Sequence, residues 1–223
     1  MSSVTRARAR PAARRPAVEK KRGRYHHGDL RRALLDAALE VLSREGASAL
    51  TLREVARRAG VTHAAPYRHF ADKQALLAEV AEEGFRMLAG EMAAGAAAHP
   101  SDPGRGLQAI GTAYVRFATT QRARFQVMFG NHVDWSCKHP KLEETADHAF
   151  GILISQVQAC QARGLIRPGD PLVAALCAWS MVHGLSELIA NGQFNALELS
   201  VPPVDQLVGI MNVMLIEGAR PRE

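Results

Sequence analysis

Apolar residues recur every three or four positions along most of the chain, a spacing that places them on one face of an α-helix. The first such pattern follows Asp29, a residue type that often caps helices, and it continues until Gly46. Turn-forming Gly and Pro residues separate the later helical patterns. These later patterns cover residues 106–120, 122–131, 142–163, 171–191 and 203–217. Because no alternating run predicts a strand, we expect an all-α protein, with a small N-terminal three-helix unit and a larger helical bundle.

A short helix with signals at both ends is predicted to begin after Thr51. The Thr51 side chain can cap this helix, while Glu54 can return a bond to the backbone amide of Thr51, which makes a capping box. Leu50 and Val55 fit the hydrophobic contact that often accompanies such a box. Gly60 then favours the left-handed conformation that ends a helix, so we expect a short helix.

Two further caps follow closely along the chain. Thr62 can cap a second short helix that runs to about His69, and Asp72 can cap a long helix that continues toward Met92. Short, closely spaced helices of this kind form a helix-turn-helix, whose second helix enters the major groove of DNA. The same coarse pattern also fits a plain helical bundle.

Positive charge is concentrated in the N-terminal third of the chain. Residues 1–24 hold nine Lys or Arg and one acid, a balance of +8, whereas residues 25–73 carry +2 and residues 74–223 carry −4. This distribution predicts a polyanionic partner for the N-terminal part alone. Residues 1–24 are also poor in large aliphatic side chains, so we expect a disordered basic arm there. A helix-turn-helix domain over residues 25–72 and a bundle over residues 73–223 complete the expected organisation.

Cysteine usage and hydropathy indicate the compartment. Cys137, Cys160 and Cys177 are too few and too widely spaced for a disulfide framework or a cysteine zinc site, and we expect all three to be small buried residues in a reducing cytosol. No apolar stretch of signal-peptide length follows the basic N-terminus. Polar residues interrupt the most apolar run, residues 172–189. We therefore expect a soluble, cytoplasmic protein with no membrane partner.

Motifs of enzymes and metal sites are missing from the sequence. It contains no His-Glu-x-x-His helix, no glycine-rich phosphate loop and no Gly-x-Ser-x-Gly elbow. We therefore expect no catalytic residue, no metal and no cofactor. A sequence-tolerant nucleic-acid binder is an alternative, because it would explain the basic arm, although it would not explain the paired helix caps.

Residues 52–73, with the sequence LREVARRAGVTHAAPYRHFADK, resemble the tetracycline-repressor (TetR) family. The family signature is a capped short helix, Ala-Gly-Val, a recognition helix ending in Tyr-x-His-Phe, and a Lys just inside the next helix. Trp179, His183 and Gly184 further resemble the C-terminal domain of a TetR subgroup that is named for these three residue types. The resemblance implies a transcriptional regulator, by default a repressor although activation stays open. Such a regulator binds a near-palindromic operator in double-stranded DNA as a homodimer, and a small apolar effector releases it.

The resemblance and the residue chemistry together indicate a DNA-binding surface. Polar side chains at the start of the recognition helix can bond to base edges, and alanine methyl groups can touch thymine. The family implies phosphate contacts near both helix starts, where free amides favour an anion. The basic arm resembles extensions that track the DNA backbone or enter a minor groove. The expected DNA contacts are Arg24, Tyr25, Thr51, Thr62, His63, Ala64, Ala65, Tyr67, Arg68, His69 and Lys73.

Several of these residues also fit other roles. Tyr67 and His69 can pack in the core of the small unit, and Thr51 can serve as a cap alone. Many relatives have a residue with a backbone N–H where this chain has Pro66. A proline here removes roughly the first hydrogen bond of the recognition helix. We therefore expect this helix to start tightly or to be slightly displaced.

The resemblance implies a ligand pocket and a dimer interface in the larger domain. Trp179 and His183, four residues apart, share one helix face. The expected ligand contacts are Phe117, Phe125, Met128, Phe129, Trp135, Trp179 and His183, and core filling is the alternative for each. The last two helices, residues 171–191 and 203–217, are apolar on more than one face, and in this family such helices pair with their copies.

Overall fold

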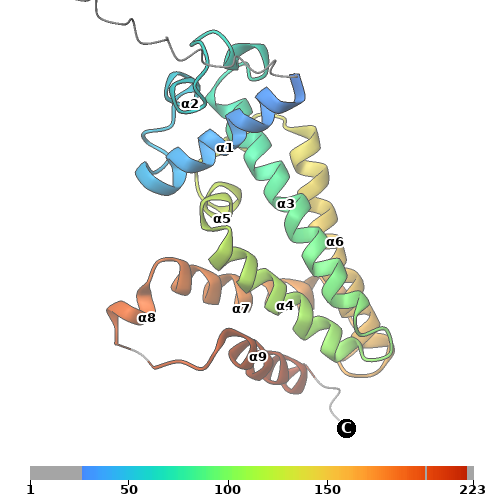
Figure 1. The fold of residues 1–223 in the computed structure, drawn as a ribbon. Helices are drawn as coiled ribbons and strands as arrows, with labels where there is room; N and C mark the ends of the chain where they lie inside the picture. Colours follow the sequence, from blue (N-terminus) through green and yellow to red (C-terminus); the bar gives the residue numbers. More distant parts are fainter. Residues whose placement is uncertain (1–26, 199, 220–223) are drawn as a thin grey trace, which may run out of the picture.

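The structure, a computed structural model, describes residues 27–198 and 200–219 (Figure 1). In this part of the chain every regular element is helical, which confirms the all-α prediction. The α-helices are α1 (His27–Glu45), α2 (Leu52–Arg58), α3 (Lys73–Ala97), α4 (Pro103–Thr120), α5 (Arg122–Phe129), α6 (Pro140–Ala162), α7 (Pro171–Ala190), α8 (Gln193–Ala196) and α9 (Val204–Gly218). A 3-10 helix, η1 (Pro66–Arg68), lies between α2 and α3. The helices predicted after residue 97 are present within a few residues of their expected bounds, and α8 is an additional short helix.

The helices α3 and α6 lie side by side and form the long axis of the molecule (Figure 1). The helices α1, α2 and η1 gather where α3 begins, whereas α4, α7 and α9 pack together at the opposite end. Between these groups, α5 contacts α1, α3 and α4. The N-terminal unit and the bundle are thus connected through α3 and α5.

The predicted capping box at the start of α2 is only half present. Thr51 Oγ1 accepts a hydrogen bond from the Glu54 amide (3.1 Å), as expected for a cap. The Glu54 carboxylate instead binds Arg57 and Arg58, one turn later on the same helix. The predicted return bond to the Thr51 amide is therefore wrong, because two guanidinium groups compete for the same carboxylate.

Aspartates cap three of the longer helices. Asp72 Oδ1 accepts the amide of Ala75 (2.8 Å) at the start of α3, as predicted, and Asp102 and Asp170 cap α4 and α7 in the same way. The expectation for Asp29 is wrong, since α1 begins at His27 and Asp29 already lies inside the helix.

The segment predicted as an α-helical recognition helix is a turn followed by η1. The carbonyl of Thr62 accepts a bond from the amide of Ala65 (2.9 Å), three residues on. The fourth residue on is Pro66, which has no N–H to donate. The chain therefore tightens into a 3-10 turn, in which the His69 amide bonds to the Pro66 carbonyl (2.9 Å). The tight start is confirmed, whereas the α-helical form over residues 62–69 is wrong.

One hydrophobic cluster crosses the predicted boundary between residues 72 and 73. It extends from Leu34 in α1 through Phe70 and Leu88 to Ala178 in α7, and all four side chains are buried. A smaller cluster joins α4, α7 and α9. The N-terminal unit and the bundle therefore share one hydrophobic core.

Two sequence expectations about burial need correction. Cys160 is buried as expected, but Cys137 and Cys177 are exposed. By length and composition alone, helix α7 could cross a membrane. The expectation that its polar residues rule out such a span is therefore wrong by this test. The helix packs against α4, α6 and α9, and much of its apolar surface stays uncovered in the single chain.

Candidate nucleic-acid interface and ligand cavity

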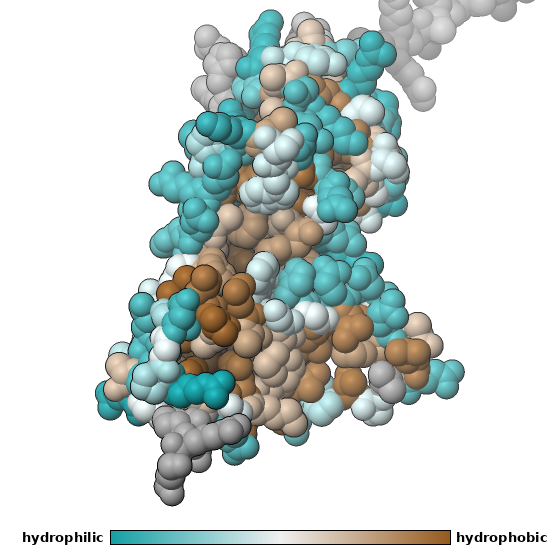
Figure 2. Space-filling model, turned by 180° about the vertical axis from the view of Figure 1, so that it is seen from behind, coloured by the Kyte–Doolittle hydropathy of each residue, from teal (hydrophilic) through white to brown (hydrophobic). Residues whose placement is uncertain are grey.

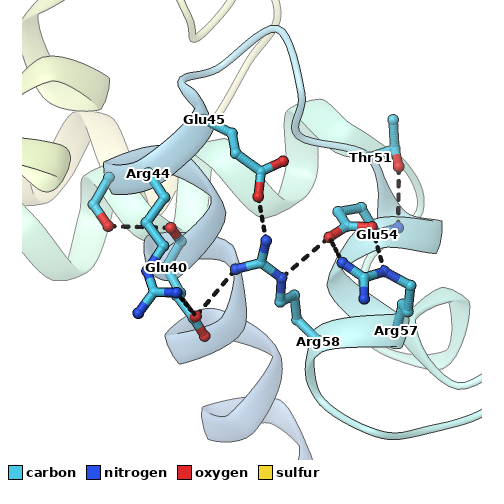
Figure 3. A network of polar contacts seen from close by, with 8 residues as sticks. Glu40, Arg44, Glu45, Thr51, Glu54, Arg57 and Arg58 are labelled. Carbon is cyan, nitrogen blue, oxygen red and sulfur yellow. Dashed lines mark hydrogen bonds and ion pairs between the residues drawn. The ribbon is translucent and has the colours of Figure 1, made fainter.

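Ion pairs connect α2 to α1 (Figure 3). Arg58, whose side chain is 17% exposed, donates to Glu40 of α1 (3.0 Å) and to Glu54 of its own helix (3.2 Å). It also pairs with Glu45 at the end of α1. The hydrogen bond from Arg57 to Glu54 (2.8 Å), with the charges of both arginines, lowers the pKa of the Glu54 carboxyl. These contacts fix α2 relative to α1, as a helix that positions a DNA-reading segment requires.

A row of exposed side chains follows α2, over residues 62–68, which we call the reading segment. Its exposed members are Thr62, His63, Ala64, Tyr67 and Arg68. Tyr67 is 56% exposed, which is unusual for an aromatic side chain that has a core directly beneath it. Ala65 is half-buried, and Pro66 and Phe70 are buried on the inner side. The segment thus exposes its polar side chains to solvent, while the buried Pro66 and Phe70 pack against the core.

The other predicted DNA contacts are partly engaged within the chain. Thr51 is exposed, but its hydroxyl oxygen already accepts a backbone amide. Lys73 Nζ donates to the Ala47 carbonyl (2.7 Å), which leaves two of the three ammonium hydrogens for another acceptor. His69 is half-buried, and its Nε2 atom is buried with no hydrogen-bond partner among the described residues.

Arg53 is a basic residue that the sequence analysis missed. It lies on α2, two residues after the Thr51 cap, and its side chain is exposed. No ion pair or hydrogen bond joins it to the residues that the structure describes, so its charge is available to a partner. Its position in the first turn of a helix that flanks the reading segment was the signal that could have identified it. Arg24 and Tyr25, together with the predicted arm, lie outside the described residues.

A cavity of about 450 Å³ lies inside the bundle. Side chains from α3, α4, α5, α6, α7 and α9 enclose it, and most of them are aromatic or aliphatic. Of the predicted ligand contacts, Met128, Phe129, Trp135 and Trp179 line this cavity. Its volume and apolar lining are typical of sites for small organic molecules.

Three of the predicted ligand contacts do not line the cavity. Phe117 and Phe125 are fully buried, each with 0% exposure, and they fill the core beside it. His183 lies behind the lining, with its ring centroid 5.0 Å from that of Phe129 and 5.6 Å from that of Trp179. His183 therefore packs against two rings of the cavity wall and does not line the cavity itself.

A hydrogen-bonded chain explains the spacing of Trp179 and His183. Trp179 Nε1 donates to the Tyr114 hydroxyl (3.0 Å), and that hydroxyl lies 2.8 Å from His183 Nδ1. Burial raises the pKa of Tyr114, against the hydrogen bond from Trp179, and burial lowers the pKa of His183, against the charge of Glu187. A neutral His183 whose Nδ1 accepts a hydrogen bond from the Tyr114 hydroxyl satisfies all three groups, and this chain connects α4 to α7. Sequence analysis missed Tyr114, although it precedes Phe117 by one helical turn.

A second polar chain links the bundle to the N-terminal unit. Arg124 of α5, only 9% exposed, donates through Nη2 to Glu83 of α3 (2.9 Å), and the other oxygen of Glu83 accepts from Arg32 of α1. Burial would raise the pKa of Glu83, but the hydrogen bond and charge of Arg124, together with Arg32, lower it overall. Because Met128 lies one turn beyond Arg124, α5 contacts both the cavity and this ion-pair chain.

Comparisons with known proteins agree with this arrangement. A family model for bacterial regulatory proteins of the tetR family matches residues 34–80, and a model for the tetracyclin repressor-like C-terminal domain matches residues 107–211. AcrR of Shigella flexneri, an HTH-type transcriptional regulator, is 44% identical over 54 residues, which are 24% of this chain and 25% of AcrR. The match thus spans about a quarter of the length of this curated relative.

Solved structures match over most of the chain. A protein of unknown function from Rhodococcus sp. RHA1 is 35% identical, with a TM-score of 0.76 over 89% of this chain and 99% of that protein. AibR, solved in complex with isovaleryl coenzyme A and operator DNA, has a TM-score of 0.64 at 18% identity, over 84% of this chain and 98% of AibR. At that identity the likeness to AibR is one of fold alone.

The fixed α2 and the outward-facing segment after it, together with the family models, place the chain in the class of DNA-binding helix-turn-helix regulators of transcription. The chain belongs to the TetR family. Its membership of the subgroup named for Trp, His and Gly stays a prediction.

Proposed function

We propose that this chain is a cytoplasmic repressor that binds a near-palindromic operator as a homodimer and is released by a small apolar ligand. The observation that carries the proposal is the exposed reading segment on a buried base. Thr62 and His63 offer donors and acceptors to base edges, and Ala64 offers a methyl group to thymine. Tyr67 and Arg68, with Arg53 on the neighbouring helix, are the proposed phosphate contacts.

Exposed apolar side chains support the dimer. They gather at the end of the molecule opposite the reading segment, whereas the N-terminal end is mostly hydrophilic (Figure 2). On α7 and α9 they are Leu172, Val173, Leu176, Leu188, Ile210, Val213 and Met214. A second copy of α7 and α9 would remove this surface from water in a two-fold contact. Such a dimer sets two reading segments about one DNA turn apart, or a multiple of it, which favours a near-palindromic site.

Helix α3 is proposed to carry the ligand signal. Phe85, Leu88 and Met92 of this helix line the cavity, and the same helix begins at the Asp72 cap just after η1. A ligand that displaces these side chains would tilt α3 and change the separation of the two reading segments. The ligand acts only to the extent that it binds the released conformation better than the DNA-bound one. AibR, a neighbour in fold, is solved with isovaleryl coenzyme A and operator DNA, which supports the combination of a ligand and DNA here, although not the class of the ligand.

The basic arm is proposed to add contacts to the DNA backbone. Each neutralised phosphate steepens the dependence of log affinity on log salt by about 0.9. Deletion of residues 1–22 should therefore weaken binding to every DNA and flatten this slope. An unchanged slope would remove the arm from the interface.

A gel-shift titration over a salt series tests the proposal, with the promoter of the protein's own gene and a scrambled DNA of equal length as probes. We expect the promoter to stay bound at salt concentrations that release the scrambled probe. Equal retention of both probes would favour a sequence-tolerant binder. The same promoter joined to a reporter gene distinguishes repression from activation.

A further inference from the structure

We infer that the cavity takes an apolar molecule with a positively charged amine and discriminates against carboxylates and phosphates. This inference rests on the proposed ligand-binding function and specifies its ligand class.

The charge inside the cavity carries the argument. Among the lining residues, all of which the structure describes, Asp147 of α6 is the only one with a charged side chain. The lining holds no Lys, Arg or His that could neutralise an anion.

Several hydrogen-bond donors of the lining are already used. The Trp179 N–H donates to Tyr114, the Tyr114 hydroxyl is shared with His183, and the Asn212 amide donates to the Gly104 carbonyl (3.2 Å). Gln108, the half-exposed Trp135 and the second amide hydrogen of Asn212 are the remaining side-chain N–H donors of the lining. These few neutral donors do not offset the repulsion between Asp147 and a carboxylate or phosphate bound beside it.

The mouth of the cavity suits a cation. Asp147 is exposed, and Trp135, another lining residue, is 47% exposed, so both lie where the cavity opens to water. An amine held there remains hydrated, can pair with the carboxylate and can face an aromatic ring, while its apolar tail lies among Phe85, Phe129 and Phe150. A cavity of about 450 Å³ holds a chain of about ten carbons.

Three probes of equal length test the inference at neutral pH: decylamine, decanol and decanoate, each below the concentration at which it forms micelles. The full chain contains two tryptophans, Trp135 and Trp179, and both line the cavity, so intrinsic fluorescence reports occupancy directly. We expect decylamine to bind at least about tenfold more tightly than decanoate, with decanol between them. The substitution Asp147→Asn should bring decylamine to within about twofold of decanol and leave decanol unchanged. Glu144→Gln, outside the lining on the same helix, is the matched control and should change each affinity by less than about twofold.

The outcomes separate the ligand class from the ligand-binding function. Decanoate binding as tightly as decylamine, with decanol bound, would overturn the inference and leave the proposed function intact. An amine preference that persists in Asp147→Asn would overturn the role of this carboxylate. If none of the probes binds, both the inference and the ligand-binding part of the proposed function are contradicted.

Discussion

The N-terminal unit and the helical bundle distribute their polar and apolar side chains in opposite ways. In the N-terminal unit, charged side chains pair across helices around Arg58, the apolar side chains are buried beneath them, and Tyr67 is the exception. In the bundle, apolar side chains enclose a cavity and also cover the outside of α7 and α9. The proposed DNA-reading end is therefore built to keep one geometry, whereas the bundle has the free volume to change its own.

The largest expected effect comes from the apolar outer surface of the bundle. Met214, 63% exposed on α9, lies on the proposed dimer face. The substitution Met214→Glu would place a charge in that contact, so we expect a monomer by light scattering. Operator affinity should fall on the order of 1,000-fold, because the second reading segment is no longer tethered. Met214→Leu should preserve both properties, and a Glu variant that stays dimeric would contradict the proposed interface.

The second largest loss of operator affinity is expected from changes in the reading segment. Tyr67 and Arg68 are exposed, so replacing both with alanine should leave the unfolding temperature unchanged. Loss of two DNA contacts should lower operator affinity by about 100-fold in an anisotropy titration. Arg86→Ala, an exposed change on α3 outside this segment, is the control and should have no effect. An affinity within threefold of the unchanged protein would argue against this surface.

Two neighbouring arginines test whether partly buried ion pairs fix the N-terminal unit. Arg58 is 17% exposed and contacts three glutamates, whereas Arg57 is 63% exposed and contacts one. In urea unfolding we expect Arg58→Ala to lower the free energy of unfolding by about 2 kcal/mol. Arg57→Ala should lower it by no more than about 0.5 kcal/mol. Equal losses would mean that the network does not depend on burial.

The smallest expected effect concerns Glu83, which joins the two regions through Arg124 and Arg32. Because the folded state lowers the pKa of Glu83, its ionised form stabilises the fold above the ordinary pKa of a glutamate. That contribution is lost as the pH falls through the lowered value. We expect Glu83→Gln to cost about 1 kcal/mol at neutral pH, since water partly screens the pair, and the difference should vanish in acid.

Unfolding followed at several pH values measures this difference. Glu82→Gln, whose partner Arg86 is an exposed residue on the same helix, is the matched control and should show a smaller, less pH-dependent loss. A difference between Glu83→Gln and the unchanged protein that persists in acid would contradict the assigned charge.

Local sequence predicted two helix caps and the tight turn of the N-terminal unit, and it predicted the cavity only in part. The caps at Thr51 and Asp72 and the tight turn at Pro66 depend on residues within four positions of one another, so they can be derived from the sequence. Pro66 also shows the limit of such reasoning, because the missing amide converted the expected α-helix into a 3-10 helix.

The cavity depends on contacts between residues far apart in the chain. Phe125 and Phe129 lie on one short helix, yet only Phe129 lines the cavity, because the packing of α5 against α3 and α4 decides which side faces inward. Tyr114 meets Trp179 across 65 positions of sequence, and no pattern within either helix reveals that bond. Helical periodicity identifies an apolar face but cannot divide it between solid core and cavity wall.

The central claim is that two copies of residues 62–68 read DNA together. Selection of bound sites from a random DNA pool by the full-length protein tests it most directly. The account predicts enrichment of one near-palindromic sequence, with half-site centres about one helical turn apart or a multiple of it. A pool that shows no enriched sequence, or a single half-site with no symmetric partner, would contradict it.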